Sequence, residues 1–214
     1  MKPYPGYLFD LDGTLVDTAP DLNAALGFAL VKHGFQAADE ALTKRWIGHG
    51  AKAMVEQALG HQDQPVDDAP IVLSTFLNYY EKHVADLSRP YPGALHALGA
   101  LQERGALLGV VTNKRTTFSL AILSALGMRQ HFEVVVCGDT CPSPKPAADP
   151  ALHACRALGL AAADALFVGD SQTDVLCARA AGCPIVCVRE GYNQGVPAEK
   201  LGADAVIESL SDLV

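Results

Sequence analysis

The chain has 214 residues, of which 50% are hydrophobic and 19% are charged, and its formal net charge at pH 7 is −8. This composition excludes an intrinsically disordered protein, and the length allows one substantial core with a small accessory lobe. The acidic balance argues against a nucleic-acid partner, so an anionic ligand would need a local cluster of positive charge or a metal ion.

The N-terminal residues show no secretory pattern, because two prolines and one lysine lead directly into a short apolar run at residues 7–9. Apolar stretches further along, such as residues 106–111, are far too short to cross a bilayer. We therefore expect a cytoplasmic protein with no membrane partner. The run at residues 7–9 itself predicts the first strand of a sheet.

The segment from residue 17 to residue 87 contains no convincing strand pattern. An apolar stripe with helical spacing occupies residues 22–30 and ends near Gly34. Further helical patterns cover residues 40–46, 51–59 and 70–84. These patterns predict a separate helical lobe, inserted after the first strand.

The remainder of the chain alternates between short apolar runs and helical patterns. The runs lie at residues 107–111, 134–137, 166–168, 185–188 and 205–207, and each is nearly continuously apolar, as expected of parallel strands buried on both faces. The helical patterns lie at residues 95–101, 117–126, 151–158 and 175–181, and a glycine follows each of them. This alternation predicts a doubly wound, parallel α/β sheet. The six cysteines form no C-x-x-C pair, so we expect free thiols rather than a zinc site.

Two carboxylates, Asp10 and Asp12, directly follow the first predicted strand, and Gly13 allows a sharp turn after them. Residues two apart in an extended segment project on the same side, and at the carboxyl end of a parallel strand that side faces the ligand crevice. Taken alone, the D-x-D pattern is more often part of a turn or a helix cap than a catalytic pair.

Polar side chains also follow the later strands. Thr112 and Asn113 come after the strand at 107–111, and Lys145 lies in the loop at 142–146. Asp170 follows the strand at 166–168, and Asp174 lies four residues beyond it. The carboxyl ends of parallel strands share one edge of a sheet, so these side chains should meet there. A nucleophile, a hydroxyl group, a cation and a pair of carboxylates are the components of a phosphoryl-transfer site.

The chain resembles the haloacid dehalogenase-like superfamily in four motifs, which occur in the order found in that superfamily. They are Asp10-Leu11-Asp12-Gly13-Thr14, Thr112-Asn113, Lys145-Pro146, and Gly169-Asp170-Ser171 with Asp174. The resemblance covers essentially the whole chain. It implies a Rossmann-like α/β core formed by residues 1–16 and 88–214, and it makes residues 17–87 an all-helical cap domain of type 1.

The resemblance implies a magnesium-dependent phosphatase for a small phosphorylated metabolite. Asp10 would be the nucleophile that forms an aspartyl-phosphate, and Asp12 would be the general acid and base. Thr112 would hold the phosphate oxygens, and Lys145 would supply a compact positive charge.

The same resemblance implies how Mg²⁺ would be held. The carboxylates of Asp10 and Asp170 and the backbone carbonyl of Asp12 would be its ligands, and Asp174 would support the metal or its waters without binding it directly. Thr14 and Asn113 would contact the substrate.

Stretches outside the motifs, at residues 17–22, 46–51, 138–139 and 191–193, resemble the phosphoglycolate phosphatases. We therefore expect 2-phosphoglycolate as the substrate. The loop at 46–50 would cover the site, and Gly48, His49 and Gly50 would contact the leaving group. Its carboxylate could be bound by backbone amides of this loop or by Lys44, Arg45 or Lys52. An ordinary turn between two helices explains the loop equally well.

Three alternatives remain open at this point. The substrate could be another small phosphometabolite such as a sugar phosphate. The protein could be a phosphomutase resembling β-phosphoglucomutase, in which the cap excludes water. It could also be a binding protein that has lost catalysis. The sequence does not indicate an oligomeric state.

Overall fold

A computed structural model of the chain describes residues 2–214. Its main part is a six-stranded sheet in the order β5-β4-β1-β6-β7-β8, in which every neighbouring pair is parallel. The strands are β1 (Gly6–Phe9), β4 (Leu107–Val111), β5 (Val134–Val136), β6 (Ala165–Gly169), β7 (Ile185–Val188) and β8 (Ala205–Ile207). This arrangement confirms the predicted doubly wound α/β fold.

Helices cover both faces of the sheet. On one face, α5 (Ala94–Glu103) and α6 (Thr116–Ala125) share a hydrophobic cluster with Tyr7 and Phe9 of β1. On the other face, α7 (Asp149–Leu158) and α8 (Gln172–Ala181) share a second cluster with Leu8. Successive side chains of a strand point to opposite faces, so a strand between two helical layers must be apolar throughout. All four residues of β1 are accordingly buried.

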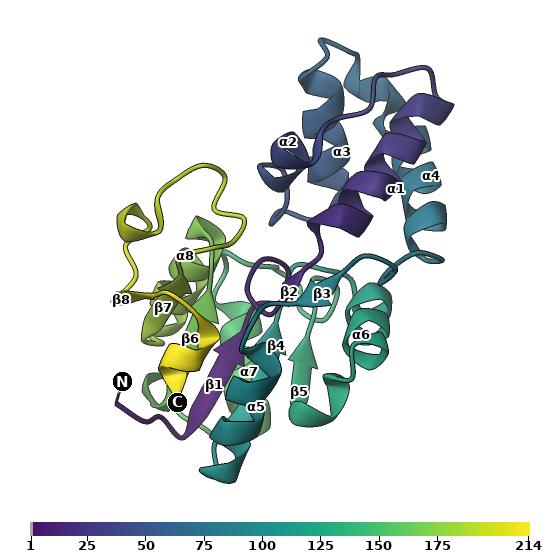
Figure 1. Ribbon diagram of the computed structural model, residues 1–214. Coiled ribbons are helices and arrows are strands. Elements are labelled where there is room, and N and C mark those ends of the chain that lie inside the picture. Colours follow the sequence, from purple (N-terminus) through teal and green to yellow (C-terminus); the bar gives the residue numbers. More distant parts are fainter. Residues whose placement is uncertain (1) are drawn as a thin grey trace.

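A lobe of four helices lies beyond the carboxyl edge of the sheet, as Figure 1 shows. It contains α1 (Ala19–Lys32), α2 (Glu40–Lys44), α3 (Ala51–Gly60) and α4 (Ala69–Tyr80). Val72, Phe76 and Tyr80 of α4 are buried at intervals of four residues, which places them on one face of the helix. The sequence pattern extends this helix to residue 84 and α2 to residue 46, but the structure ends both helices earlier.

A two-stranded antiparallel ribbon, which the sequence analysis did not anticipate, joins the lobe to the sheet. It pairs β2 (Val16–Asp17) with β3 (Arg89–Pro90). Beside it, the buried carboxylate of Asp21 accepts hydrogen bonds of 2.6–3.1 Å from the backbone N–H groups of Leu87 and Ser88 and from the Ser88 hydroxyl. These contacts hold the two connections of the lobe next to each other.

Short 3₁₀ turns complete the chain at Val66–Asp68, Arg129–His131, Ala162–Asp164, Ala198–Lys200 and Leu210–Leu213. All six cysteines are free thiols, and five of them are buried. Among the described residues, no helix combines the length and the apolar character needed to cross a membrane.

Candidate active site

Asp10 and Thr112 occupy equivalent positions, one residue beyond the ends of β1 and β4. The backbone N–H of Asp10 donates to Val168 O at 2.9 Å, and that of Thr112 donates to Val136 O at 2.9 Å. The ladder of the sheet thus continues for one residue and fixes both backbones at its carboxyl edge. Both side chains are buried. The helical lobe lies beyond this edge of the sheet (Figure 1).

Lys145 is a buried cation between two carboxylates. Its Nζ lies 2.9 Å from Oδ1 of Asp10 and 2.6 Å from Oδ1 of Asp174. Burial alone would lower the pKa of Lys145, but the charges of Asp10 and Asp174 raise it above its usual value, so the side chain keeps its proton. The amide of Asn113 holds the backbone of Lys145 from both sides, since Oδ1 accepts from the N–H and Nδ2 donates to the carbonyl, each at 2.9 Å.

Asp170 is held from three directions. The Thr14 hydroxyl donates to its Oδ1 at 2.6 Å, and the backbone N–H of Tyr192 donates to its Oδ2 at 2.6 Å. Gly13 and Gly191 approach so closely that a Cβ atom on either would lie within 2.5 Å of an atom of Asp170. Both positions therefore exclude any larger residue unless the carboxylate moves.

Asp10, Asp170 and Asp174 offer carboxylate oxygens within 4.8 Å of one another, and all three are buried. Of the described residues, Lys145 alone forms ion pairs with this group. Burial raises the pKa of Asp10 to about 7 although Lys145 opposes the shift, and burial together with Asp174 raises the pKa of Asp170 well above its usual range. The site therefore holds more negative charge than its lysine offsets, and a divalent cation with oxygen ligands fits this donor set.

Asp174 is already engaged within this group. Its Oδ1 faces Lys145, and its Oδ2 accepts from the hydroxyl of Ser171 at 2.6 Å and from the backbone N–H groups of Asp170 and Ser171 at 3.2 and 3.1 Å. Asp170 accepts a single hydrogen bond on each oxygen, so Asp10 and Asp170 keep more lone pairs free for a metal ion than Asp174 does.

Asp12 is paired with a cation that the sequence analysis did not single out. Nζ of Lys114 lies 3.0 Å from both carboxylate oxygens of Asp12, and the Thr18 hydroxyl donates to Oδ1 at 2.6 Å. Lys114 lies in the loop after β4, and it is buried. Its position, directly after Thr112-Asn113 at the same edge as Asp12, is the signal that could have identified it.

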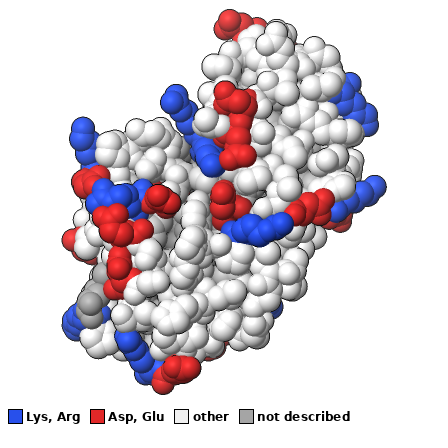
Figure 2. All heavy atoms as spheres, viewed as in Figure 1, with Lys and Arg blue, Asp and Glu red and all other residues white. Residues whose placement is uncertain are grey.

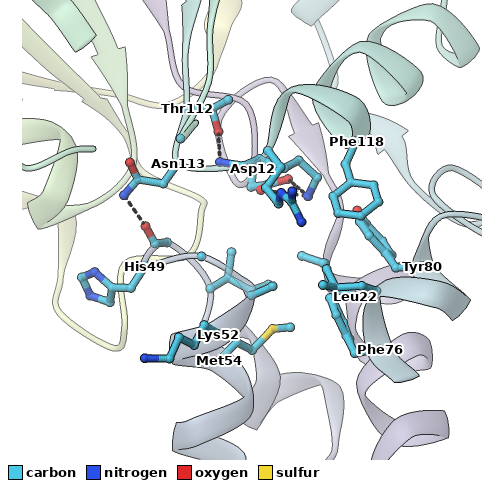
Figure 3. Close-up of a pocket in the computed structure, with 18 of the residues that line it drawn as sticks. Asp12, Leu22, His49, Lys52, Met54, Phe76, Tyr80, Thr112, Asn113 and Phe118 are labelled. Atoms are coloured by element: carbon cyan, nitrogen blue, oxygen red, sulfur yellow. Dashed lines mark hydrogen bonds and ion pairs between the residues drawn. The ribbon is translucent and has the colours of Figure 1, made fainter. Parts of the chain in front are cut away.

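A cavity of about 280 Å³ lies between the sheet edge and the helical lobe. The core contributes polar residues to its wall, namely Asp10, Asp12, Thr112, Asn113 and Lys114. The lobe contributes a mostly apolar wall, with Leu22, Met54, Leu73, Phe76, Leu77 and Tyr80 among its members. Figure 3 shows Asp12 and Thr112 on the core side and Leu22, Met54 and Phe76 facing them.

The loop predicted to cover the site reaches the cavity in part. Gly48, His49, Gly50 and Lys52 line it, and the Gly48 carbonyl accepts a 3.0 Å hydrogen bond from Nδ2 of Asn113. Trp46 instead is buried, with its ring 5.7 Å from that of His61. Lys44, Arg45 and Thr14 are absent from the described residues that line the cavity. The hydroxyl of Thr14 is directed at Asp170 instead.

Charged side chains of both signs lie along the boundary between the helical lobe and the sheet on the face shown in Figure 2, and neither sign forms a large patch there. Two exposed basic residues line the cavity. Lys52 pairs with Glu56 at 3.3 Å, and Arg115 lies 4.0 Å from Asp139.

The whole chain is similar to known proteins. Residues 7–188 match the family model for haloacid dehalogenase-like hydrolases. The chain is 38% identical to a phosphoglycolate phosphatase of Thiobacillus denitrificans over 99% of the chain and 96% of the relative, and 40% identical to one of Yersinia pseudotuberculosis over 100% and 93%. A solved structure from Haemophilus somnus, described as a predicted phosphoglycolate phosphatase, superposes with a TM-score of 0.92 at 34% identity, covering 100% of this chain and 97% of that one.

Proposed function

This chain belongs to the haloacid dehalogenase-like hydrolase family and is a phosphatase, and we propose that it hydrolyses 2-phosphoglycolate to glycolate and inorganic phosphate with Mg²⁺ bound. The names of its relatives support this substrate. The observation that carries the proposal is the placement of Asp10, which lies at the edge of the cavity with Lys145 at 2.9 Å and Asp170 in the same acidic group.

We further propose that residues 17–87 act as a cap over a core formed by residues 1–16 and 88–214. Two contacts support this division. Asn113 of the core binds the Gly48 carbonyl of the lobe, and Thr18, at the base of the lobe, donates to Asp12. A cap placed in this way would exclude water from the leaving group during the first step.

In the proposed first step, a carboxylate oxygen of Asp10 attacks phosphorus and the bond from phosphorus to the ester oxygen breaks. Asp12 gives its proton to the departing glycolate oxygen. Lys145 remains charged and offsets the negative charge that gathers around Asp10, while Thr112 orients the phosphate oxygens. When bound by Asp10, Asp170 and the backbone carbonyl of Asp12, Mg²⁺ would supply further positive charge to the phosphate.

In the second step, Asp12 takes a proton from a water molecule, and that water attacks the phosphorus of the aspartyl-phosphate. The bond from phosphorus to Asp10 breaks, which releases inorganic phosphate and restores the carboxylate. Lys114 and Thr18 hold the side chain of Asp12 in one position, so the group that gave the proton is in place to remove the next one.

The test is phosphate release by the purified protein from a panel of phosphorylated metabolites, with Mg²⁺ and with a chelator. We expect 2-phosphoglycolate to give the highest kcat/KM and the chelator to abolish turnover. A sugar phosphate hydrolysed more than about tenfold faster would contradict the proposed substrate, since a tenfold ratio corresponds to about 1.4 kcal/mol of transition-state stabilisation. Isomerisation of a sugar phosphate without phosphate release would instead indicate a mutase.

A further inference from the structure

One N–H group of the Lys114 ammonium has no hydrogen-bond acceptor among the described residues at the cavity wall. Its ammonium carries three donors, and two of them face the oxygens of Asp12 at 3.0 Å each. Within residues 2–214, no third acceptor lies within hydrogen-bonding distance of Nζ. Burial lowers the pKa of Lys114, but Asp12 and then the nearby Tyr80 hydroxyl raise it. The side chain is only 5% exposed and lines the cavity. A buried ammonium with a free donor is unusual, because unmet hydrogen-bonding capacity costs free energy.

Tyr80, the last residue of α4, places a second polar group without a hydrogen-bond partner beside Lys114. It is 1% exposed, and its hydroxyl is the buried side-chain polar atom that lacks a hydrogen-bond partner among the described residues. Nζ of Lys114 lies 4.9 Å from the centre of its ring. The ring of Tyr80 lines the cavity beside Phe76 and Phe118, as Figure 3 shows. A cation from the core and a hydroxyl from the lobe therefore stand together at one end of the cavity.

We propose that the free N–H of Lys114 and the hydroxyl of Tyr80 bind the carboxylate of the leaving group, so that the site selects phosphate esters of 2-hydroxy carboxylic acids. This inference rests on the proposed function and assigns residues to its specificity. A carboxylate presents two acceptor oxygens, which match one donor from the core and one from the lobe, and a charged partner strengthens both hydrogen bonds.

The position of Asp12 sets the distance of this subsite from the reacting atoms. Asp12 contacts the ester oxygen in the first step, and Lys114 is in direct contact with Asp12. In an ester of a 2-hydroxy acid, a single carbon separates the ester oxygen from the carboxylate. A carboxylate at that position reaches Lys114 without entering the apolar part of the cavity.

The other cations of the cavity are less suited to this role. The side chain of Lys52 is 77% exposed and that of Arg115 is 61% exposed, whereas that of Lys114 is 5% exposed. Water and salt screen exposed charges, so the buried ammonium of Lys114 attracts an anion in the cavity more strongly.

The experiment compares 2-phosphoglycolate with its carboxamide, which has the same shape and no charge on the group that replaces the carboxylate. The readout is the ratio of the two kcat/KM values in the wild type, Tyr80→Phe, Lys114→Met and the control Lys82→Met, which removes an exposed lysine of the lobe. We expect the ratio to fall about 5-fold in Tyr80→Phe and about 30-fold in Lys114→Met, the latter corresponding to about 2 kcal/mol. Lys82→Met should keep the wild-type ratio.

Tyr80→Phe shows whether a changed ratio could result from loss of folding. Among the described residues the Tyr80 hydroxyl has no hydrogen-bond partner, so its removal breaks no hydrogen bond. The urea unfolding midpoint of Tyr80→Phe should equal or exceed that of the wild type. A wild type that hydrolyses both esters equally well, or variants that keep the wild-type ratio, would overturn the subsite while leaving the proposed function intact. A wild type that releases phosphate from other esters but not from 2-phosphoglycolate would contradict the proposed function, and the inference with it.

Discussion

Gly13 lies so close to Asp170 that a Cβ atom on the glycine would stand 2.5 Å from Oδ2 of the aspartate. The backbone of Gly13 also has a φ of +87°, a left-handed conformation that side chains disfavour. The turn after β1 therefore supports the acidic group in two ways. It reverses the chain after Asp12, and it leaves room for the carboxylate that arrives from β6.

Gly13→Ala should combine backbone strain with a collision at Asp170. We expect a loss of about 1 kcal/mol or more in unfolding free energy from the strain, and a loss of more than about tenfold in Mg²⁺ affinity and in kcat/KM from the collision. Gly202→Ala is the matched control, because Gly202 has a φ of +83° and a Cβ atom there would meet no other atom within 4 Å. Isothermal titration calorimetry would measure the affinity. Equal effects of the two substitutions on Mg²⁺ binding would contradict the close approach.

The stabilisation of the protein by Mg²⁺ should depend on pH. Burial raises the pKa of Asp10 from 3.8 to about 7. Between these two pH values the Asp10 carboxyl is protonated in the metal-free folded state and ionised in the unfolded state. Asp10 therefore makes the metal-free protein less stable as pH rises through this window. Mg²⁺ requires the ionised carboxylate, so it must displace that proton at low pH.

We accordingly expect Mg²⁺ to raise Tm more at about pH 8 than at about pH 5.5. Thermal melts with and without the metal at both pH values would measure this, with Asp10→Asn as the variant in which the difference between pH values shrinks. An identical increase in Tm at the two pH values would contradict the assignment of Asp10 as a ligand.

Asp12→Asn should separate the two chemical steps. With p-nitrophenyl phosphate the leaving group needs no proton, so the first turnover should stay close to the wild-type rate. The second step lacks its base and should slow about 100-fold or more. Stopped-flow absorbance should then show a burst of nitrophenolate equal to the enzyme concentration, followed by slow turnover. If Asp12→Asn turned over slowly without a burst, the slow step would be the first one, which would contradict the role of Asp12 as the base of the second step.

Tyr192→Phe should weaken the base of the helical lobe. The Tyr192 hydroxyl accepts a 2.8 Å hydrogen bond from the backbone N–H of Ala19 and donates to Asp17, so its removal should cost about 1–2 kcal/mol in urea unfolding. Tyr79→Phe, at a half-buried tyrosine of α4, should change stability by less than about 0.5 kcal/mol. The backbone N–H of Tyr192 still donates to Asp170 in the Tyr192→Phe variant, so the Mg²⁺ affinity of that variant should equal that of the wild type. A marked loss of that affinity would contradict this division of roles.

The sheet and the residues at its edge could be predicted because they depend on local pattern and on one rule of topology. Short apolar runs identify β1, β4 and β6, which are neighbours in the sheet and parallel. Residues that follow parallel neighbouring strands meet at one edge. Asp10, Thr112 and Asp170 could therefore be placed together without knowledge of any contact between them.

The same rule could have placed Lys114 near Asp12, but it could not predict the burial of Lys114 or the direction of the Thr14 hydroxyl. Burial of Lys114 depends on Tyr80, which the lobe carries across the sheet edge, and no local pattern encodes that approach. The hydroxyl of Thr14 is directed at Asp170, a contact between residues distant in the sequence, and its expected contact with substrate stays a prediction. The ribbon of β2 and β3 was missed because two-residue strands show no periodicity.

The central claim is that Asp10 carries the phosphoryl group, and trapping the phosphorylated enzyme tests it most directly. The wild type and Asp12→Asn would be mixed with p-nitrophenyl phosphate labelled in its phosphate, quenched in acid and digested. Mass spectrometry should locate an acid-stable, hydroxylamine-sensitive phosphate on the peptide that contains Asp10, in larger amount in Asp12→Asn. Asp10→Asn should show no label and no turnover. Label on another residue, or normal turnover by Asp10→Asn, would contradict the account.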